Sequence, residues 1–135
     1  KISKAVARIA LGLQKDIRLG NLDAKRDWGH AKDFVQAMWL MLQHPTPEDF
    51  VIGTGEAHSV REFVGETFKA AGISNWQTFV ATDSSSFRPA EALPLCADPS
   101  KAEQKLGWKR TVSFKQLVRL MFEADLEAEK TSQKK

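Results

Sequence analysis

Apolar residues recur three and four positions apart in several stretches of this chain, which is the spacing of one face of a helix. The pattern and its flanking residues predict helices over residues 1–12, 31–43, 59–71, 98–107 and 113–127. The helix over 59–71 has the clearest boundaries, because Ser59 and Glu62 form a capping box and Gly72 follows its end. Ser113 and Gln116 form a second capping box at the start of the last helix.

The helix over residues 31–43 should bury a single apolar stripe against the core. The residues at the required spacing are Phe34, Val35, Met38, Met41 and Leu42. Three short apolar runs, 16–19, 50–54 and 77–81, predict strands, of which 50–54 is typical of a buried strand and 77–81 of an edge strand. Residues 82–94 contain three serines and two prolines, which indicates a long loop. The predicted fold class is therefore a helix-rich α/β fold with few short strands, packed against a larger partner domain because so small a sheet is marginal alone.

Length and composition indicate an ordinary globular chain. The 135 residues are 42% hydrophobic and 27% charged, which suits one domain over residues 1–129. The net charge of +3 equals the three lysines of residues 130–135, so residues 1–129 sum to zero and the basic end is expected to be a disordered tail. We see no nucleic-acid-binding region, signal peptide or apolar run of the ~20 residues that a membrane span needs. A single cysteine, Cys96, cannot form an internal disulfide and fits a cytoplasmic protein.

The most informative stretch is residues 19–34, where a predicted strand turns at Gly20-Asn21 and passes Lys25 and Arg26 before the next helix. Two adjacent cations in such a connection suit an anion, since arginine offers a planar fork to phosphate oxygens and lysine a point charge. A solvated loop with a surface Arg-Asp pair explains the same residues from composition alone.

The order of the residues in this stretch favours the anion site. Residues 20–33 read Gly-Asn-Leu-Asp-Ala-Lys-Arg-Asp-Trp-Gly-His-Ala-Lys-Asp and closely resemble the matching stretch of GDP-mannose 4,6-dehydratases, which are extended short-chain dehydrogenase/reductases. The resemblance continues through residues 48–52, 58–64, 88–91 and 100–108, and covers the chain up to about residue 127. One departure is visible at Ala97, where the family usually has glycine before the aspartate.

The resemblance implies a set of residues that bind the sugar nucleotide. Arg26 and Arg88 would clasp the diphosphate, the carboxylate of Glu91 would hold ribose hydroxyls, and Asn21 and Lys1 would lie at the nucleotide. This logic is physically sound, because two guanidinium forks can neutralise a pyrophosphate and a carboxylate accepts hydrogen bonds from vicinal hydroxyls.

Members of the family bind a dinucleotide with a G-x-G-x-x-G loop and use a Tyr-x-x-x-Lys pair, and this chain has neither that loop nor any tyrosine. We therefore expect the C-terminal substrate-binding portion of a longer, homo-oligomeric lyase, with no complete Rossmann domain, no catalytic residue and no NADP site in this chain. The resemblance implies that the whole enzyme converts GDP-mannose to GDP-4-dehydro-6-deoxymannose with NADP. Two alternatives remain: the same portion of another nucleotide-sugar epimerase or dehydratase, and a stand-alone binding module without catalysis.

Other candidate chemistry is weaker. The three histidines and Cys96 lack metal-ligand spacing, so we predict no metal site. His30 is expected to be a structural hydrogen-bonding residue and His58 to lie on a loop surface. The four tryptophans are expected to be packing residues, because aromatic side chains bury large areas.

Overall fold

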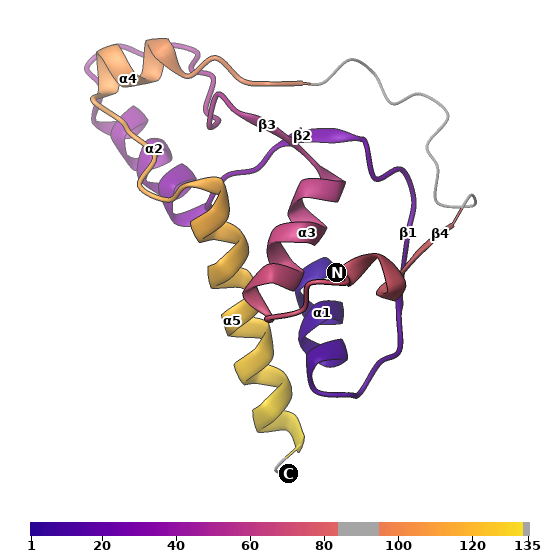
Figure 1. Ribbon diagram of the computed structural model, residues 1–135. Coiled ribbons are helices and arrows are strands. Elements are labelled where there is room, and N and C mark those ends of the chain that lie inside the picture. The colour runs from indigo at the N-terminus through magenta and orange to yellow at the C-terminus, as the bar shows by residue number, and fades with distance from the viewer. Residues whose placement is uncertain (84–94, 134–135) are drawn as a thin grey trace. The chain divides into compact units, whose positions relative to one another are not determined.

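A computed structural model describes residues 1–83 and 95–133 of the chain. Its helices are α1 (Ile2–Ala10), α2 (Ala31–Gln43), α3 (Val60–Ala70), the 3-10 helix η1 (Trp76–Phe79), α4 (Ser100–Leu106) and α5 (Phe114–Gln133) (Figure 1). Its strands are β1 (Ile17–Leu19), β2 (Lys25–Asp27), β3 (Ala57–Ser59) and β4 (Val80–Thr82). Arg88 and Glu91, and the predicted loop over 82–94 from residue 84 onward, lie outside the described residues.

The described residues group into two compact units. The first unit comprises residues 1–24, 59–83 and 118–133, and the second comprises residues 25–58 and 95–117. Each unit is assembled from segments that are separated in sequence, so no linker rich in proline, glycine or serine marks the boundary. This is why the sequence showed no division.

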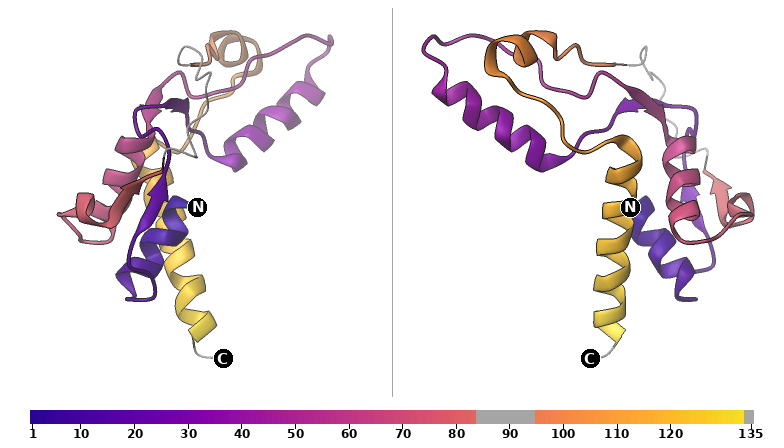
Figure 2. Two further views of the ribbon diagram at one scale, coloured as in Figure 1. Left: turned by 90° about the vertical axis from the view of Figure 1, so that its right-hand side faces the viewer. Right: turned by 60° about the vertical axis from the view of Figure 1, so that its left-hand side comes forward.

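The first unit is built on a two-stranded parallel sheet in which Ile17 pairs with Val80 and Leu19 with Thr82. Helix α1 contacts both β1 and α3, which the views in Figure 2 also show. Apolar side chains from these elements and from α5 form the core of this unit. The buried members are Ala5, Val6, Ala7, Ile9, Ile17, Leu19, Val64, Phe68 and Phe122.

The second unit contains a smaller core between α2 and α4. Its buried residues are Ala37, Ala102 and Trp108, and half-buried apolar side chains from α2 and from the segment that contains Phe50 and Ile52 pack against them. Strands β2 and β3 form a separate two-stranded sheet.

Helix boundaries follow the predictions closely. Ser59 Oγ accepts the Glu62 N–H while the Glu62 carboxylate accepts the Ser59 N–H at 2.6 Å, and Ser113 and Gln116 pair in the same reciprocal way. Gly12, Gly72 and Gly107 each adopt positive φ within two residues of the end of a helix, as expected of glycine at a helix C-terminus.

Two predicted strands were wrong in detail. Residues 50–54 form no strand, and residues 76–79 are a 3-10 helix, so that β4 begins only at Val80. The strands β2 and β3 were not predicted, because their sequences, Lys-Arg-Asp and Ala-His-Ser, contain no apolar run.

Helix α5 runs six residues beyond its predicted end at residue 127 and includes residues 130–133, which were expected to belong to a disordered tail. Glu129, which is buried in this helix, accepts a hydrogen bond from Arg8 at 2.8 Å and pairs with Lys4 at 3.3 Å. These contacts with α1 hold the end of α5 in place. No helix in the described part of the chain is long and apolar enough to cross a membrane.

Truncating the side chain of Phe63, which is 3% exposed on α3, should lower the free energy of unfolding by roughly 3–5 kcal/mol, since the lost contacts leave a cavity. Urea denaturation of Phe63→Ala measures this loss. The control is Lys69→Ala on the exposed side of the same helix, which should change stability by less than about 0.5 kcal/mol. A loss below about 1 kcal/mol for Phe63→Ala would show that this face of α3 is not core.

Candidate functional site

Asn21 lies in the connection that follows β1 in the first unit. Its side-chain oxygen accepts the backbone N–H of Asp23 at 2.9 Å, which closes a local turn. The same connection is tied to the start of α3, because Leu22 and Ala24 accept the backbone N–H groups of Arg61 and Val60 at 2.7 and 3.0 Å. The position of Asn21 is therefore set by the first turn of α3.

Arg26 is the central residue of β2 in the second unit, not part of a loop. Its side chain is exposed, and its Nη1 donates to the carbonyl of Lys25 at 2.7 Å. A strand holds the backbone of Arg26 more firmly than a loop would, so the guanidinium group is presented from a defined position.

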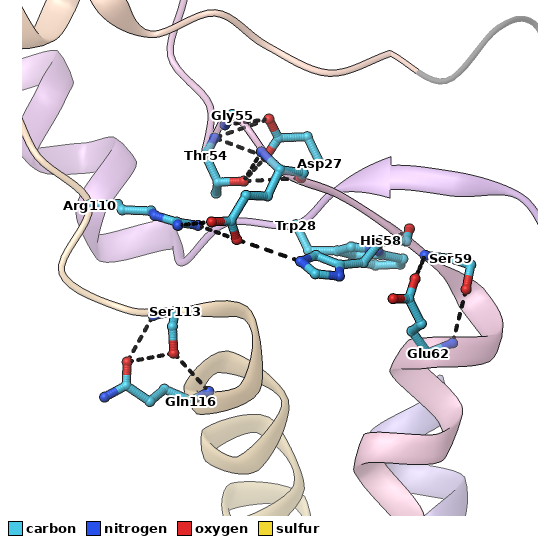
Figure 3. Close-up of polar contacts among 11 residues, drawn as sticks. Asp27, Trp28, Thr54, Gly55, His58, Ser59, Glu62, Arg110, Ser113 and Gln116 are labelled. Carbon is cyan, nitrogen blue, oxygen red and sulfur yellow. Dashed lines mark hydrogen bonds and ion pairs between the residues drawn. The ribbon is translucent and has the colours of Figure 1, made fainter.

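Asp27, the next residue of β2, connects three segments of the second unit. Its carboxylate accepts the Thr54 hydroxyl at 2.6 Å, the Thr54 N–H at 2.9 Å and the Gly55 N–H at 3.2 Å (Figure 3). It also accepts the Ala97 N–H at 3.2 Å. Burial acts to raise the pKa of Asp27, but the hydrogen bonds from Thr54, Ala97 and Gly55 outweigh it and lower this pKa below its ordinary value. The interpretation of Asp27 as half of a solvated surface Arg-Asp pair, which composition alone suggested, is therefore wrong.

The close approach of these segments explains Gly53. A Cβ atom at this position would lie 2.2 Å from the Ala97 Cβ and 2.8 Å from the Asp27 carboxylate, so only glycine fits. Ala97 itself does not have positive φ, since all such residues in the described part of the chain are glycines. The alanine that departs from the family pattern is therefore compatible with this backbone.

A second polar group surrounds Glu56. Arg110 donates two hydrogen bonds to its carboxylate, and His58 Nε2 lies 3.6 Å from it (Figure 3). Hydrogen bonding from Arg110 lowers the pKa of Glu56. The His58 ring stacks on Phe114 with 3.8 Å between ring centroids, and its backbone carbonyl accepts the Trp28 indole N–H at 3.3 Å. His58 is therefore a packed residue of β3, and the prediction of a loop-surface residue was wrong.

Helix α2 is anchored through the buried carboxylate of Asp33. This carboxylate accepts the Thr111 hydroxyl at 2.6 Å and the backbone N–H groups of Thr111 and Val112, while the Asp33 carbonyl accepts the Trp108 indole N–H at 2.8 Å. Burial acts to raise the pKa of Asp33, and these hydrogen bonds together with the nearby His30 lower it.

Lys1 lies at an open pocket of about 360 Å³ in the first unit. Lys4, Arg8 and Arg18 also line this pocket, so four cationic side chains surround it. Glu129 pairs with two of them, Lys4 and Arg8.

The five predicted substrate residues are thus distributed across the chain. Lys1 and Asn21 belong to the first unit, Arg26 belongs to the second, and Arg88 and Glu91 lie outside the described residues. Within the described ranges, His, Cys, Asp and Glu side chains form no group of three that could hold a metal ion.

Solved structures first show the fold. RMD from Pseudomonas aeruginosa, solved with NADPH, superposes with a TM-score of 0.81 over 95% of this chain and 41% of its own, at 22% identity. A UDP-glucose 4-epimerase from Bifidobacterium longum, solved with NAD+ and UDP, gives a TM-score of 0.73 over 96% of this chain and 39% of its own, at 24% identity. The chain therefore has the fold of a portion of each of these proteins, and this is the helix-rich α/β fold that the sequence predicted.

Sequence relatives then define the family. The sequence model of the family described as GDP-mannose 4,6 dehydratase matches residues 1–121. A GDP-mannose 4,6 dehydratase from Cricetulus griseus is 51% identical over 148 residues, which cover 98% of this chain and 40% of the relative. The chain belongs to the GDP-mannose 4,6-dehydratase family, and it spans about 40% of the length of curated relatives that it matches.

Asp27 is the residue of this site that sequence reasoning missed. It precedes neither a helix nor a recognisable cap, and its partners lie 27 to 70 residues away. The pair Gly53 and Gly55 around Thr54 was the available signal, because glycines that bracket a hydroxyl residue indicate a close backbone approach.

Replacing Asp27 by asparagine should destabilise the protein at pH 7 by about 1–3 kcal/mol. The reason is that the side-chain amide has one acceptor oxygen, whereas the donors in the wild type share the two oxygens of the carboxylate. The pKa of Asp27 is lowered on folding, so the stability that its carboxylate contributes is present above the unfolded pKa of ~3.9 and is lost as pH falls through the folded value. Urea denaturation from pH 7 to pH 2 should therefore show a smaller loss of stability in Asp27→Asn than in the wild type.

The matched control is Asp49→Asn, which changes an exposed carboxyl in the same unit. This variant should follow the wild-type pH profile. Equal acid sensitivity of Asp27→Asn and the wild type would contradict the role assigned to the Asp27 hydrogen bonds.

Proposed function

We propose that this chain is the GDP-sugar-binding part of an enzyme that converts GDP-mannose to GDP-4-dehydro-6-deoxymannose. The observation that carries this proposal is the family match over residues 1–121, which includes the stretch of Lys1, Asn21, Arg26, Arg88 and Glu91. The exposed position of Arg26 on β2 supports it, because a diphosphate ligand needs an accessible guanidinium group.

In this proposal Arg26 and Arg88 bind the diphosphate, Glu91 accepts the ribose hydroxyls, and Asn21 and Lys1 lie at the nucleotide. The cationic surroundings of Lys1 are consistent with an anionic ligand, since Lys4, Arg8 and Arg18 line the same pocket. Each of these groups binds or orients the substrate, and none of them transfers a proton or hydride.

NADP would supply the hydride transfers in the complete enzyme, but the residues of this chain do not fit it. Gly53 and Gly55 have the spacing of the first two glycines of a dinucleotide loop, but His58 occupies the third position. The backbone N–H groups of Thr54 and Gly55 donate to the Asp27 carboxylate, so they are not directed at a pyrophosphate. The dinucleotide site is therefore proposed to lie in a Rossmann domain of the same protein, beyond this sequence.

In the complete enzyme, Arg26→Ala and Arg88→Ala should each weaken GDP-mannose binding roughly 10- to 100-fold, because a charge-assisted hydrogen bond contributes about 1.5–3 kcal/mol. Titration calorimetry measures the affinities. Arg88→Lys should restore binding only in part, since lysine keeps the charge and loses the fork.

Guanosine, which lacks phosphates, should bind the wild type and both alanine variants alike. Arg119→Ala is the matched protein control, because Arg119 is an exposed arginine paired with Glu123 on α5. Unchanged GDP-mannose affinity in both variants, or an equal loss of guanosine affinity, would refute the two-arginine clasp. Competition with GDP against UDP separates this proposal from another nucleotide-sugar epimerase or dehydratase.

This chain alone should bind no NADP that calorimetry can detect, because it lacks the glycine-rich loop. A saturable signal at micromolar NADP would overturn the assignment of the dinucleotide site to another part of the protein.

A further inference from the structure

A pocket of about 410 Å³ lies beside the end of α3 in the first unit. This volume is within the range of small-molecule sites in proteins. Gly65 and Lys69 line the pocket from α3, Ile73 and Ser74 line it from the turn that follows, and Trp76 lines it from η1. We call this cavity the α3 pocket.

Gly65 lies in the middle of α3, where glycine destabilises a helix relative to alanine. Its φ is not positive, so the backbone does not require glycine here. Among the described residues, the nearest atoms to a Cβ at this position would be Trp76 Nε1 at 3.7 Å and Trp76 Cε2 at 4.0 Å, which are ordinary van der Waals distances. A methyl group would therefore fit the fold, but it would occupy the α3 pocket and cover the N–H edge of the indole ring.

Trp76 is half-buried, and part of its ring packs against the core of the first unit. The indole N–H groups of Trp28 and Trp108 donate to backbone carbonyls, as is usual for buried tryptophan. The Trp76 indole N–H has no acceptor in the part of the chain that the structure describes. Because Trp76 lines the α3 pocket, this donor is available to a ligand bound there.

The polar side chains of the α3 pocket favour an anion. Lys69 supplies an ammonium group that is 75% exposed, and Ser74 supplies a hydroxyl group. No acidic side chain is found among the described residues that line the pocket. Glu66 lies 4.0 Å from Lys69 Nζ, which is the limit for an ion pair, so the ammonium group can still bind a second anion.

Carbonyl groups at the end of α3 would repel an anion if they were unpaired. Those of Thr67, Phe68 and Lys69 each accept a backbone N–H group from residues 71–73, at 3.0–3.1 Å. The turn after the helix thus satisfies these carbonyls, and the charge of Lys69 sets the sign of the ligand.

We propose that the α3 pocket binds a small aromatic carboxylate. The ring of the ligand lies on the backbone of α3 at Gly65 and against the side chains of Trp76 and Ile73, where aromatic surface is available for stacking. The carboxylate accepts hydrogen bonds from the Lys69 ammonium group and the Trp76 indole N–H. Of the residues proposed to bind the sugar nucleotide, those that the structure describes do not line this pocket, so the proposal goes beyond the proposed function.

Titration calorimetry of the full-length protein with 2-naphthoate tests the proposal. GDP is present at a saturating concentration, so that a nucleotide site is already filled. We expect saturable binding of one 2-naphthoate per chain, and at least 10-fold weaker binding of 2-naphthamide, which has the same ring but no charge.

Three variants assign this binding to the α3 pocket. Lys69→Met and Trp76→Phe should each weaken 2-naphthoate binding about 10-fold, because each removes one donor to the carboxylate. The matched control is Lys115→Met, which removes an exposed lysine from α5 and should leave the affinity unchanged. Gly65→Ala should raise the urea midpoint of unfolding, because alanine favours a helix, and yet weaken 2-naphthoate binding at least 10-fold.

The opposite signs expected for Gly65→Ala separate a binding role from a structural one. Higher stability with unchanged 2-naphthoate affinity would overturn the proposal, as would the absence of a saturable signal in the wild type. Equal affinities for 2-naphthoate and 2-naphthamide would refute the anionic ligand. Binding that GDP abolishes would assign 2-naphthoate to a nucleotide site and would also overturn the proposal. Failure of the two-arginine clasp of Arg26 and Arg88 would leave these results unaffected.

Discussion

The second unit depends on the hydrogen bonds that the carboxylate of Asp27 accepts. It collects hydrogen bonds from Thr54, Gly55 and Ala97 and so joins β2 to two segments that are distant in sequence. Its neighbour Arg26, which we propose to bind the diphosphate, lies on the same strand, so the hydrogen bonds of Asp27 also fix the backbone of Arg26. The hydrogen bonds keep the pKa of Asp27 low despite burial, and the ionised form is the one that can accept from every donor.

Several other charged side chains of the second unit have structural partners. Arg110 is held by Glu56, and Lys101 and Lys105 both pair with Glu48, whose pKa they lower to about 2. These exposed pairs contribute little free energy individually, but they orient the segments that carry them. Arg26 is exposed on β2 and Lys1 lines its pocket, and both are among the residues that we propose to bind the sugar nucleotide.

The two units also differ in how complete their cores are. The first unit has a paired sheet covered by helices, with Val6, Val64 and Phe68 fully buried. The second has a small core, and its helix α2 leaves Val35, Met38 and Leu42 of the predicted buried stripe exposed.

Local signals in the sequence determined the helices, because a capping box or a terminal glycine involves residues only three or four positions apart. Ser59 with Glu62, Ser113 with Gln116 and the glycine after α4 therefore lie where they were predicted. The family, and with it the set of candidate substrate residues, also followed from the sequence, since long strings in a fixed order are specific. Only the tertiary structure decided the roles of Asp27 and His58 and the exposed side of α2. These features depend on contact partners that lie tens of residues away in the sequence. The pattern within one segment does not show which side of a helix, or which carboxylate, those partners will contact.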